Sequence, residues 1–121
     1  MKVAIIGSRN FPDAYVRVRK CIIKNYKLYG NGLILLSGGS GSVDNAAYAE
    51  AITRGIPIHI YPANWNKYGN RAAYLRNKRI VKLCDIVYAF WDGRSPGTSM
   101  VIQLAKEMGK ELVIRRPEKG V

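Results

Sequence analysis

Short runs of Val, Ile and Leu alternate along the chain with longer segments whose apolar residues recur at helical spacing. Runs that are apolar at nearly every position are typical of strands covered on both faces of a parallel sheet. The pattern predicts five strands, at Val3 to Ile6, Leu33 to Leu36, Pro57 to Ile60, Ile86 to Phe90 and Glu111 to Ile114. Strands that alternate with helices indicate β-α-β units, so we expect a three-layer α/β/α fold.

Four helices are expected between these strands. They run from about Asp13 to Leu28, from about Ser42 to before Gly55, from about Asn70 to Leu83, and from Gly97-Thr98 to before Gly109. Glycine adopts the left-handed conformation that ends many helices, which accounts for the stops at Gly55 and Gly109. One long irregular stretch remains, from Tyr61 to Gly69, and loops of this length are often functional. The expected topology is Rossmann-like, with strand order 3-2-1-4-5.

The length and composition are those of a packed globular protein. A chain of 121 residues suits one domain spanning residues 1–121, and 48% of the residues are hydrophobic while 23% are charged. No apolar run reaches the roughly 18 residues that a membrane helix needs. Met1-Lys2 leads directly into a strand-like run, unlike a secretion signal. We therefore expect a cytoplasmic protein with no membrane partner.

The charge balance indicates the class of partner. Lys and Arg number 20 against 8 Asp and Glu, a net charge of +12, which attracts polyanions. The same excess also keeps a small protein soluble, so charge alone names no ligand. Cys21 and Cys84 stand apart in apolar stretches and His59 is the only histidine, so no zinc cluster is predicted. We expect two free, buried thiols, no metal and no cofactor.

Polar loops follow the first, second and fourth predicted strands. In an open parallel sheet, ligands bind beyond the carboxyl ends of the strands. The loops are Gly7-Ser8-Arg9-Asn10, Ser37-Gly38-Gly39-Ser40-Gly41-Ser42 and Trp91 to Thr98. Glycines let amides approach an anion, and the following helix offers unpaired donors, so the second loop and Gly97-Thr98 predict phosphate cradles. Glycine and serine clusters also simply turn chains, which is the other interpretation.

The usual nucleotide signatures are absent from these loops. No lysine follows the glycines as in a phosphate-loop ATPase, and the first turn lacks the spaced glycines of a dinucleotide fold. Neither ATP hydrolysis nor NAD binding is indicated.

Arg76 and Asn77 interrupt the apolar stripe of the third predicted helix. The stripe consists of Ala72, Ala73, Ile80, Val81 and Cys84. A guanidinium on this face suits a phosphate contact in the crevice, and the alternative is a structural ion pair with Asp85 or Asp92. A basic surface surrounds the stripe, at Lys67, Arg71, Lys78, Arg79 and Lys82.

Two tryptophans and two carboxylates complete the candidates. Trp91 ends a central strand, and an aromatic ring beside cations can stack a base, whereas Trp65 suits a lid or an oligomer contact. Asp92, at the same strand end, is placed to accept ribose hydroxyls, hold a metal or act on a glycosidic bond. Asp44, in the first turn of the second helix, is explained by the helix dipole. Asp92 and Asp44 are the two weak catalytic candidates.

Five motifs together resemble the SLOG superfamily. They are Ile6-Gly7-Ser8-Arg9, Leu36 to Asp44, Arg76 to Val81, Ala89-Phe90-Trp91-Asp92-Gly93 and Ser95-Pro96-Gly97-Thr98. The sequence is most similar to the YspA-like branch of small Rossmann-like proteins, from Met1 to about Ile114. The resemblance implies binding or sensing of a nucleotide-derived ligand.

Two other SLOG families imply different mechanisms. The DprA family, which binds single-stranded DNA, is similar at Gly7 to Arg9, Ser37 to Asp44 and Arg76 to Ile80. The LOG phosphoribohydrolases share the glycine loop and an arginine nine residues before an aspartate, here Arg76 and Asp85. Their paired glutamates are replaced by Met100 and Val101, so the residues thought to assist N-glycosidic cleavage are missing. Both families form dimers, which implies a homodimer here.

The sequence therefore predicts a binder or sensor of a nucleotide or another phosphorylated ligand, with single-stranded DNA binding and nucleotide N-glycosidase activity as the alternatives. Phosphate donors are expected from the two glycine loops, positive charge from Arg9 and Arg76, and nucleoside contacts from Trp91 and Asp92. The full predicted site is Gly7, Ser8, Arg9, Ser37, Gly38, Gly39, Gly41, Arg76, Asn77, Trp91, Asp92, Gly97 and Thr98.

Overall fold

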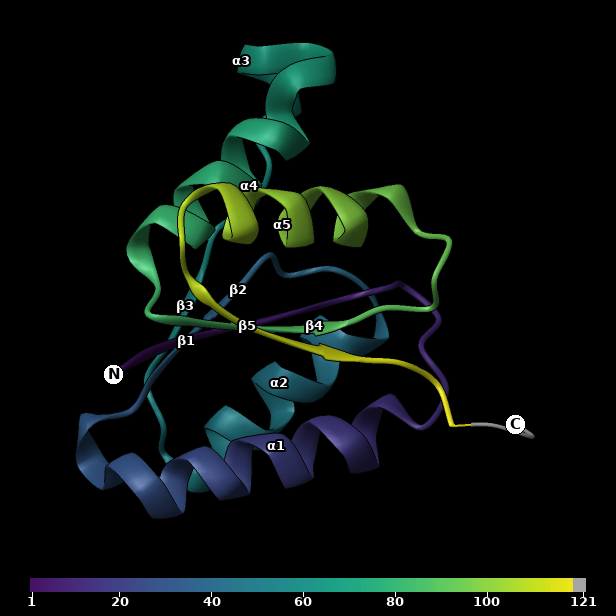
Figure 1. The fold of residues 1–121 in the computed structure, drawn as a ribbon. Helices are drawn as coiled ribbons and strands as arrows, with labels where there is room; N and C mark the ends of the chain where they lie inside the picture. The colour runs from purple at the N-terminus through teal and green to yellow at the C-terminus, as the bar shows by residue number, and fades with distance from the viewer. Residues whose placement is uncertain (119–121) are drawn as a thin grey trace.

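A five-stranded parallel sheet runs through the centre of the computed structural model, which describes residues 1–118 (Figure 1). The strands are β1 (Lys2–Gly7), β2 (Ile34–Ser37), β3 (Ile58–Ile60), β4 (Ile86–Phe90) and β5 (Glu111–Arg115). Each neighbouring pair is parallel, and the order is β3-β2-β1-β4-β5. The predicted α/β Rossmann-like fold and the strand order 3-2-1-4-5 are confirmed.

Helices cover both faces of the sheet. The longer ones are α1 (Ala14–Tyr29), α2 (Gly41–Arg54), α4 (Ala72–Leu83) and α5 (Pro96–Glu107). Figure 1 shows α1 and α2 on one side of the sheet and α4 and α5 on the other. These are the four predicted helices, close to their predicted limits. Within residues 1–118, no helix has the length and apolar character needed to cross a membrane.

The stretch from Tyr61 to Gly69, predicted to be irregular, contains a short helix. It is α3 (Trp65–Tyr68), and a single 3-10 turn, η2 (Gly69–Arg71), joins it to α4; a similar turn, η1 (Gly30–Gly32), follows α1. The Asn64 side chain caps α3 by accepting a hydrogen bond from the Lys67 amide at 3.1 Å. This local cap is the signal that the prediction missed.

Alternate residues of β1 divide the core into two clusters. Val3 and Ile5 pack with α1 and α2, whereas Ala4 and Ile6 pack with α4 and α5. Successive strand side chains point to opposite faces, so burial of both faces accounts for the unbroken apolar runs. The two thiols are free and buried, one in each cluster, as predicted. Burial raises the pKa of Cys21 to about 12 and that of Cys84 to about 11, which keeps both thiols protonated.

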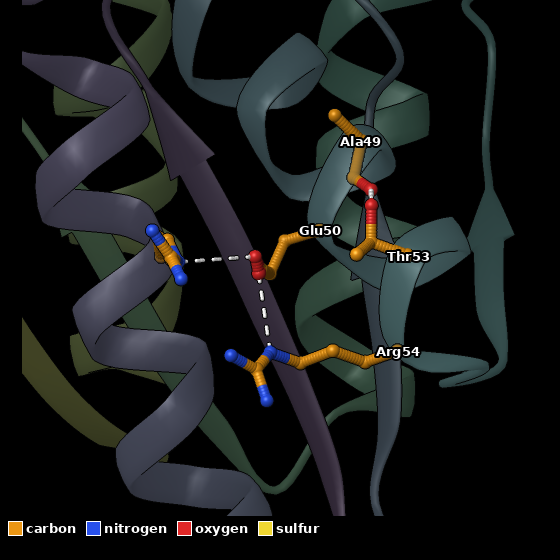
Figure 2. Close-up of polar contacts among 5 residues, drawn as sticks. Ala49, Glu50, Thr53 and Arg54 are labelled. Carbon is orange, nitrogen blue, oxygen red and sulfur yellow. Dashed lines mark hydrogen bonds and ion pairs between the residues drawn. The ribbon is translucent and has the colours of Figure 1, made fainter.

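A buried carboxylate helps to join α1 to α2. Glu50 is 3% exposed, and its oxygens lie 3.5 Å from Nε of Arg19 on α1 and 3.1 Å from Nε of Arg54 on α2. Figure 2 shows Glu50 pointing from α2 toward α1, while Thr53, on the same helix, donates a hydrogen bond to the Ala49 carbonyl at 2.8 Å. The α1–α2 layer is thus held by charge as well as by apolar packing.

The register brings three polar loops to one edge of the sheet. Gly7 at the end of β1 pairs with Phe90 at the end of β4, and Ser37 at the end of β2 pairs with Ile60. The loops that follow β1, β2 and β4 therefore leave the sheet side by side, at its carboxyl edge.

Candidate functional site

A cavity of about 350 Å³ opens at the carboxyl edge of the sheet. Its walls are the loops after β1 and β2, the inner side of α4 and the beginning of α5, and Trp65 of α3 adds an indole. The lining residues are Ile6, Gly7, Ser8, Arg9, Gly38, Ser40, Asp44, Trp65, Ala73, Arg76, Asn77, Ser95, Pro96, Gly97 and Thr98. This volume lies at the lower end of the range of small-molecule sites, roughly 300–1,000 Å³.

Eight of the predicted site residues meet in this cavity: Gly7, Ser8, Arg9, Gly38, Arg76, Asn77, Gly97 and Thr98. Asp44, predicted only as a weak catalytic candidate, lines it too. Ser37, Gly39, Gly41, Trp91 and Asp92 are not among the lining residues. Sequence reasoning did not include Trp65, Ser40 or Ala73 in the site, although Trp65 stood out as an aromatic residue in a loop beside the sheet.

Arg76 is fixed by hydrogen bonds to the chain. Nη1 donates to the carbonyl oxygens of Gly38 at 3.0 Å and Tyr61 at 3.4 Å, and Nε donates to Oδ1 of Asn77 at 2.7 Å. The alternative predicted for this residue, an ion pair with Asp85 or Asp92, is not formed; the ion pairs among residues 1–118 both involve Glu50. Burial lowers the pKa of Arg76 and nearby Asp44 opposes that shift, but a guanidinium stays charged at neutral pH.

The glycine-rich loop after β2 uses much of its own hydrogen-bonding capacity. The Gly39 amide donates to Oγ of Ser37 at 3.2 Å, the Ser40 amide to Oδ2 of Asp44 at 2.8 Å, and the Ser42 amide to the carbonyl of Arg9 at 2.8 Å. Amides that already have acceptors are poor donors to an anion. This loop therefore shapes the cavity wall more than it offers a phosphate cradle.

The first turn of α5 is more open. Gly97 and Thr98 follow Pro96 at the start of the helix, and the first amides of a helix have no acceptor within it. A Cβ atom added at Gly97 would meet no heavy atom within 4 Å, so the backbone there is accessible from the cavity. The positive end of the helix dipole adds to the attraction for an anion.

Asp44 carries an unpartnered oxygen. The residue is 7% exposed; Oδ2 accepts the Ser40 amide, while Oδ1 has no hydrogen-bond partner among the described residues. Burial raises the pKa of Asp44 to about 6, against the opposing effects of the Ser40 amide, the Ser37 hydroxyl and the Arg76 guanidinium. The sequence predicted that Asp44 lies in the first turn of α2, but no sequence pattern shows whether a buried oxygen has a hydrogen-bond partner.

Asp92 and Trp91 shape the turn that leads into α5. Oδ1 of Asp92 accepts the amides of Arg94 and Ser95, both at 2.8 Å, and Oδ2 accepts the Ser95 hydroxyl at 2.9 Å. These bonds lower the pKa of Asp92 to about 2. The Trp91 indole donates to the Ser95 carbonyl at 3.1 Å and packs against the α4–α5 core cluster. The contacts of both residues position the start of α5, and their predicted contacts with a nucleoside stay a prediction.

A groove adjoins the cavity at Arg76, which lines both. It has a volume of about 670 Å³ and runs beside β3 and α3. The guanidinium of Arg79 lies 5.1 Å from the centre of the Tyr61 ring, and the ammonium of Lys67 lies 5.2 Å from that of Tyr68. Cations and aromatic rings are thus interleaved along this groove. Within residues 1–118 no three His, Cys, Asp or Glu side chains gather as they do around a metal ion.

Solved structures with a similar fold exist, although the sequence itself has no match among family models or curated proteins. DNA processing protein A (DprA) from Helicobacter pylori, described for its single-stranded DNA binding mode, has a TM-score of 0.73 at 22% identity; the match covers 99% of this chain and 67% of that one. DprA from Streptococcus pneumoniae has a TM-score of 0.73 at 20% identity, with 93% and 49% covered.

A third similar structure is TM1055, a structural genomics target, with a TM-score of 0.68 at 18% identity; the match covers 92% of this chain and 71% of that one. This chain spans about half of the Streptococcus protein. At these identities the likeness concerns the fold, and it is the small Rossmann-like fold that the SLOG resemblance implied.

Proposed function

We propose that this protein binds a nucleotide or a nucleotide-derived phosphorylated ligand in the cavity at the carboxyl edge of the sheet. The observation that supports this best is the meeting, in one cavity, of the open first turn of α5 with Arg9 and Arg76. A helix N-terminus with adjacent guanidinium groups is a favourable environment for a phosphate group. The +12 net charge raises the local concentration of anions near the molecule.

The cavity walls suggest how such a ligand lies. The phosphate takes the end of the cavity formed by the amides of Gly97 and Thr98, with the exposed Arg9 side chain contributing positive charge. Trp65 is 58% exposed and forms part of the wall, so its indole is available to stack on a base. The Arg76 side chain is already held by Gly38, Tyr61 and Asn77, so its positive charge is available without the loss of side-chain entropy that binding would otherwise cost.

Calorimetric titration with the four ribonucleoside monophosphates tests this function. We expect binding by the wild-type protein and at least about tenfold weaker binding by Arg76→Ala, because charge-assisted contacts contribute roughly 1.5–3 kcal/mol. Lys106→Ala is the matched control, because it removes one positive charge from the last turn of α5, at the opposite end from the cavity. No binding at millimolar ligand, or equal binding by Arg76→Ala, would falsify the proposal.

Single-stranded DNA binding is the second candidate, and the groove beside the cavity favours it. The groove continues from Arg76 past Tyr61 and Arg79 to Lys67 and Tyr68, and base stacking beside cations is how proteins hold a single strand. Binding of single-stranded DNA is recognised by an affinity that rises with oligonucleotide length and falls steeply with salt concentration, because several counterions are released from the phosphates. A mononucleotide site shows neither property strongly.

Cleavage of the N-glycosidic bond has less support from the cavity. Met100 stands at one of the positions of the LOG glutamates, and its sulfur accepts a hydrogen bond from Nδ2 of Asn77 at 3.5 Å. A thioether has no proton to transfer, so Met100 cannot replace a catalytic glutamate. Asp92 has both oxygens engaged, which leaves Asp44 as the carboxylate of the cavity. Chromatography of the titrated nucleotides for free base measures this activity directly.

A further inference from the structure

The free oxygen of Asp44 is the starting observation. Among the described residues it is the one buried side-chain oxygen or nitrogen without a hydrogen-bond partner, and its carboxylate belongs to the cavity wall. Buried polar groups in folded proteins are nearly always hydrogen-bonded, and each exception calls for an explanation. A partner supplied by the ligand is such an explanation, because Asp44 is 7% exposed and cannot turn out to bulk water without leaving its bond to the Ser40 amide.

The chemistry of the cavity limits what that partner is. An anionic group is repelled by the carboxylate and has a better place at the start of α5. A metal ion held by protein side chains alone lacks further ligands, since no group of three His, Cys, Asp or Glu side chains gathers within residues 1–118. The nearby guanidinium of Arg76 directs Nη1 to the Gly38 and Tyr61 carbonyls and Nε to Asn77. The Ser37 hydroxyl is near enough to lower the pKa of Asp44, but it makes no hydrogen bond to Oδ1. A neutral O–H donor on the ligand fits the remaining position.

We propose that Oδ1 of Asp44 accepts a hydrogen bond from a ribose hydroxyl, so that the cavity selects ribonucleotides over deoxyribonucleotides. This inference rests on the proposed function. The sugar is the part of a nucleotide next to the phosphate, and both the phosphate end and Asp44 belong to the same cavity. Carboxylates that accept ribose hydroxyls recur in nucleotide-binding α/β folds. A site with a buried acceptor discriminates against a ligand that lacks the donor, because the acceptor then stays unpaired.

Calorimetric titration with paired ligands at pH 8 tests this proposal. Each ribonucleoside monophosphate is compared with its 2′-deoxy and 2′,3′-dideoxy forms, and ribose 5-phosphate is compared with 2-deoxyribose 5-phosphate. The sugar phosphates carry no base, so they separate a sugar hydroxyl from a base amine as the donor. We expect the wild-type protein to bind the tightest ribonucleotide about tenfold or more tightly than its 2′-deoxy form, and its 2′,3′-dideoxy form no more tightly than the 2′-deoxy form.

Variants assign the selectivity to Asp44. Asp44→Asn keeps its one side-chain oxygen for the Ser40 amide and so places a donor amino group toward the cavity in place of the acceptor, and we expect its preference for the ribose forms to fall to about threefold or less. Glu107→Gln is the charge-matched control, because Glu107 is exposed in the last turn of α5, and it is expected to keep the full preference.

The outcomes separate this inference from the function it rests on. Binding of ribo and deoxy forms with equal affinity by the wild-type protein overturns the role of Asp44 and leaves nucleotide binding in place. A preference that survives in Asp44→Asn overturns it as well. Failure of every monophosphate to bind overturns both proposals. The comparison of ligands on the wild-type protein does not depend on whether the variant folds.

Discussion

The guanidinium of Arg76 occupies the space that a side chain at Gly38 would take. A Cβ atom at position 38 would lie 2.6 Å from Nη1 of Arg76, and the same nitrogen donates to the Gly38 carbonyl at 3.0 Å. A loop at the end of β2 and a helix that begins 34 residues later are thereby joined into one wall of the cavity. The glycine is needed so that the arginine can approach the backbone.

Gly38→Ala tests this relationship. The displaced atom is the far end of a flexible side chain, so we expect the variant to fold and to lose little stability. The guanidinium moves away from the loop, and nucleotide binding falls toward that of Arg76→Ala. Thermal unfolding and calorimetric titration measure the two effects. Gly32→Ala is the control, because a Cβ there meets nothing within 4 Å; binding by Gly38→Ala equal to that of the control contradicts the coupling.

Gly7→Ala tests a different use of glycine in the same cavity. A Cβ at position 7 overlaps the Val43 side chain of α2, which is fully buried and cannot withdraw to solvent. We expect a loss of about 1–3 kcal/mol in the free energy of unfolding, as for other overpacked cores, measured by urea denaturation. The double variant Gly7→Ala/Val43→Ala gives the test of cause. If the double variant loses as much free energy of unfolding as the two single variants lose together, the overlap between the new Cβ and Val43 is not the reason for the loss.

The spacing of apolar residues along the sequence was enough to predict the fold. Unbroken apolar runs such as Ile86 to Phe90 predict strands buried on both faces, and this holds because helices cover both faces. The helix stops predicted from Gly55 and Gly109 also agree with the structure, where both residues have positive φ angles of 68° and 65°. These features depend on local chemistry that each segment carries by itself.

The site was only partly predictable, because a glycine shows that a side chain is missing but not what fills the space. At Gly38 the occupant is Arg76 and at Gly7 it is Val43, whereas at Gly97 the space is open. Asp92 illustrates the same limit for a carboxylate, since its oxygens bond to its own turn. Whether a polar group has a partner depends on long-range packing, which no single segment reveals.

Arg79→Gln distinguishes the groove from the cavity. Arg79 lies over the Tyr61 ring in the groove but does not line the cavity. If a single strand follows the groove, the variant binds an oligothymidine of about 12 nucleotides several-fold more weakly, and the slope of log affinity against log salt becomes shallower by about 1. Binding of a mononucleotide is expected to stay unchanged. Fluorescence anisotropy at several salt concentrations measures both; an unchanged slope removes the groove from the DNA path.

The buried Asp44 gives the protein a predictable dependence of stability on pH. Burial raises its pKa from 3.8 to about 6, so the folded state binds the proton more tightly than the unfolded state does. The resulting stabilisation is fully present below about pH 4 and is lost as the pH rises through about 6. A shift of this size corresponds to roughly 3 kcal/mol, at 1.36 kcal/mol for each pKa unit.

Asp44→Asn removes this titration, and it is expected to make the protein more stable than the wild type at pH 8, by up to about 3 kcal/mol. The advantage shrinks toward pH 4, because the wild-type carboxyl is then neutral too. Urea denaturation at pH 4, 6 and 8 measures the difference, with Glu107→Gln as an exposed control. An advantage that does not grow between pH 4 and pH 8 means that the pKa of Asp44 is not raised in the folded protein, so its carboxylate is not buried as the structure describes.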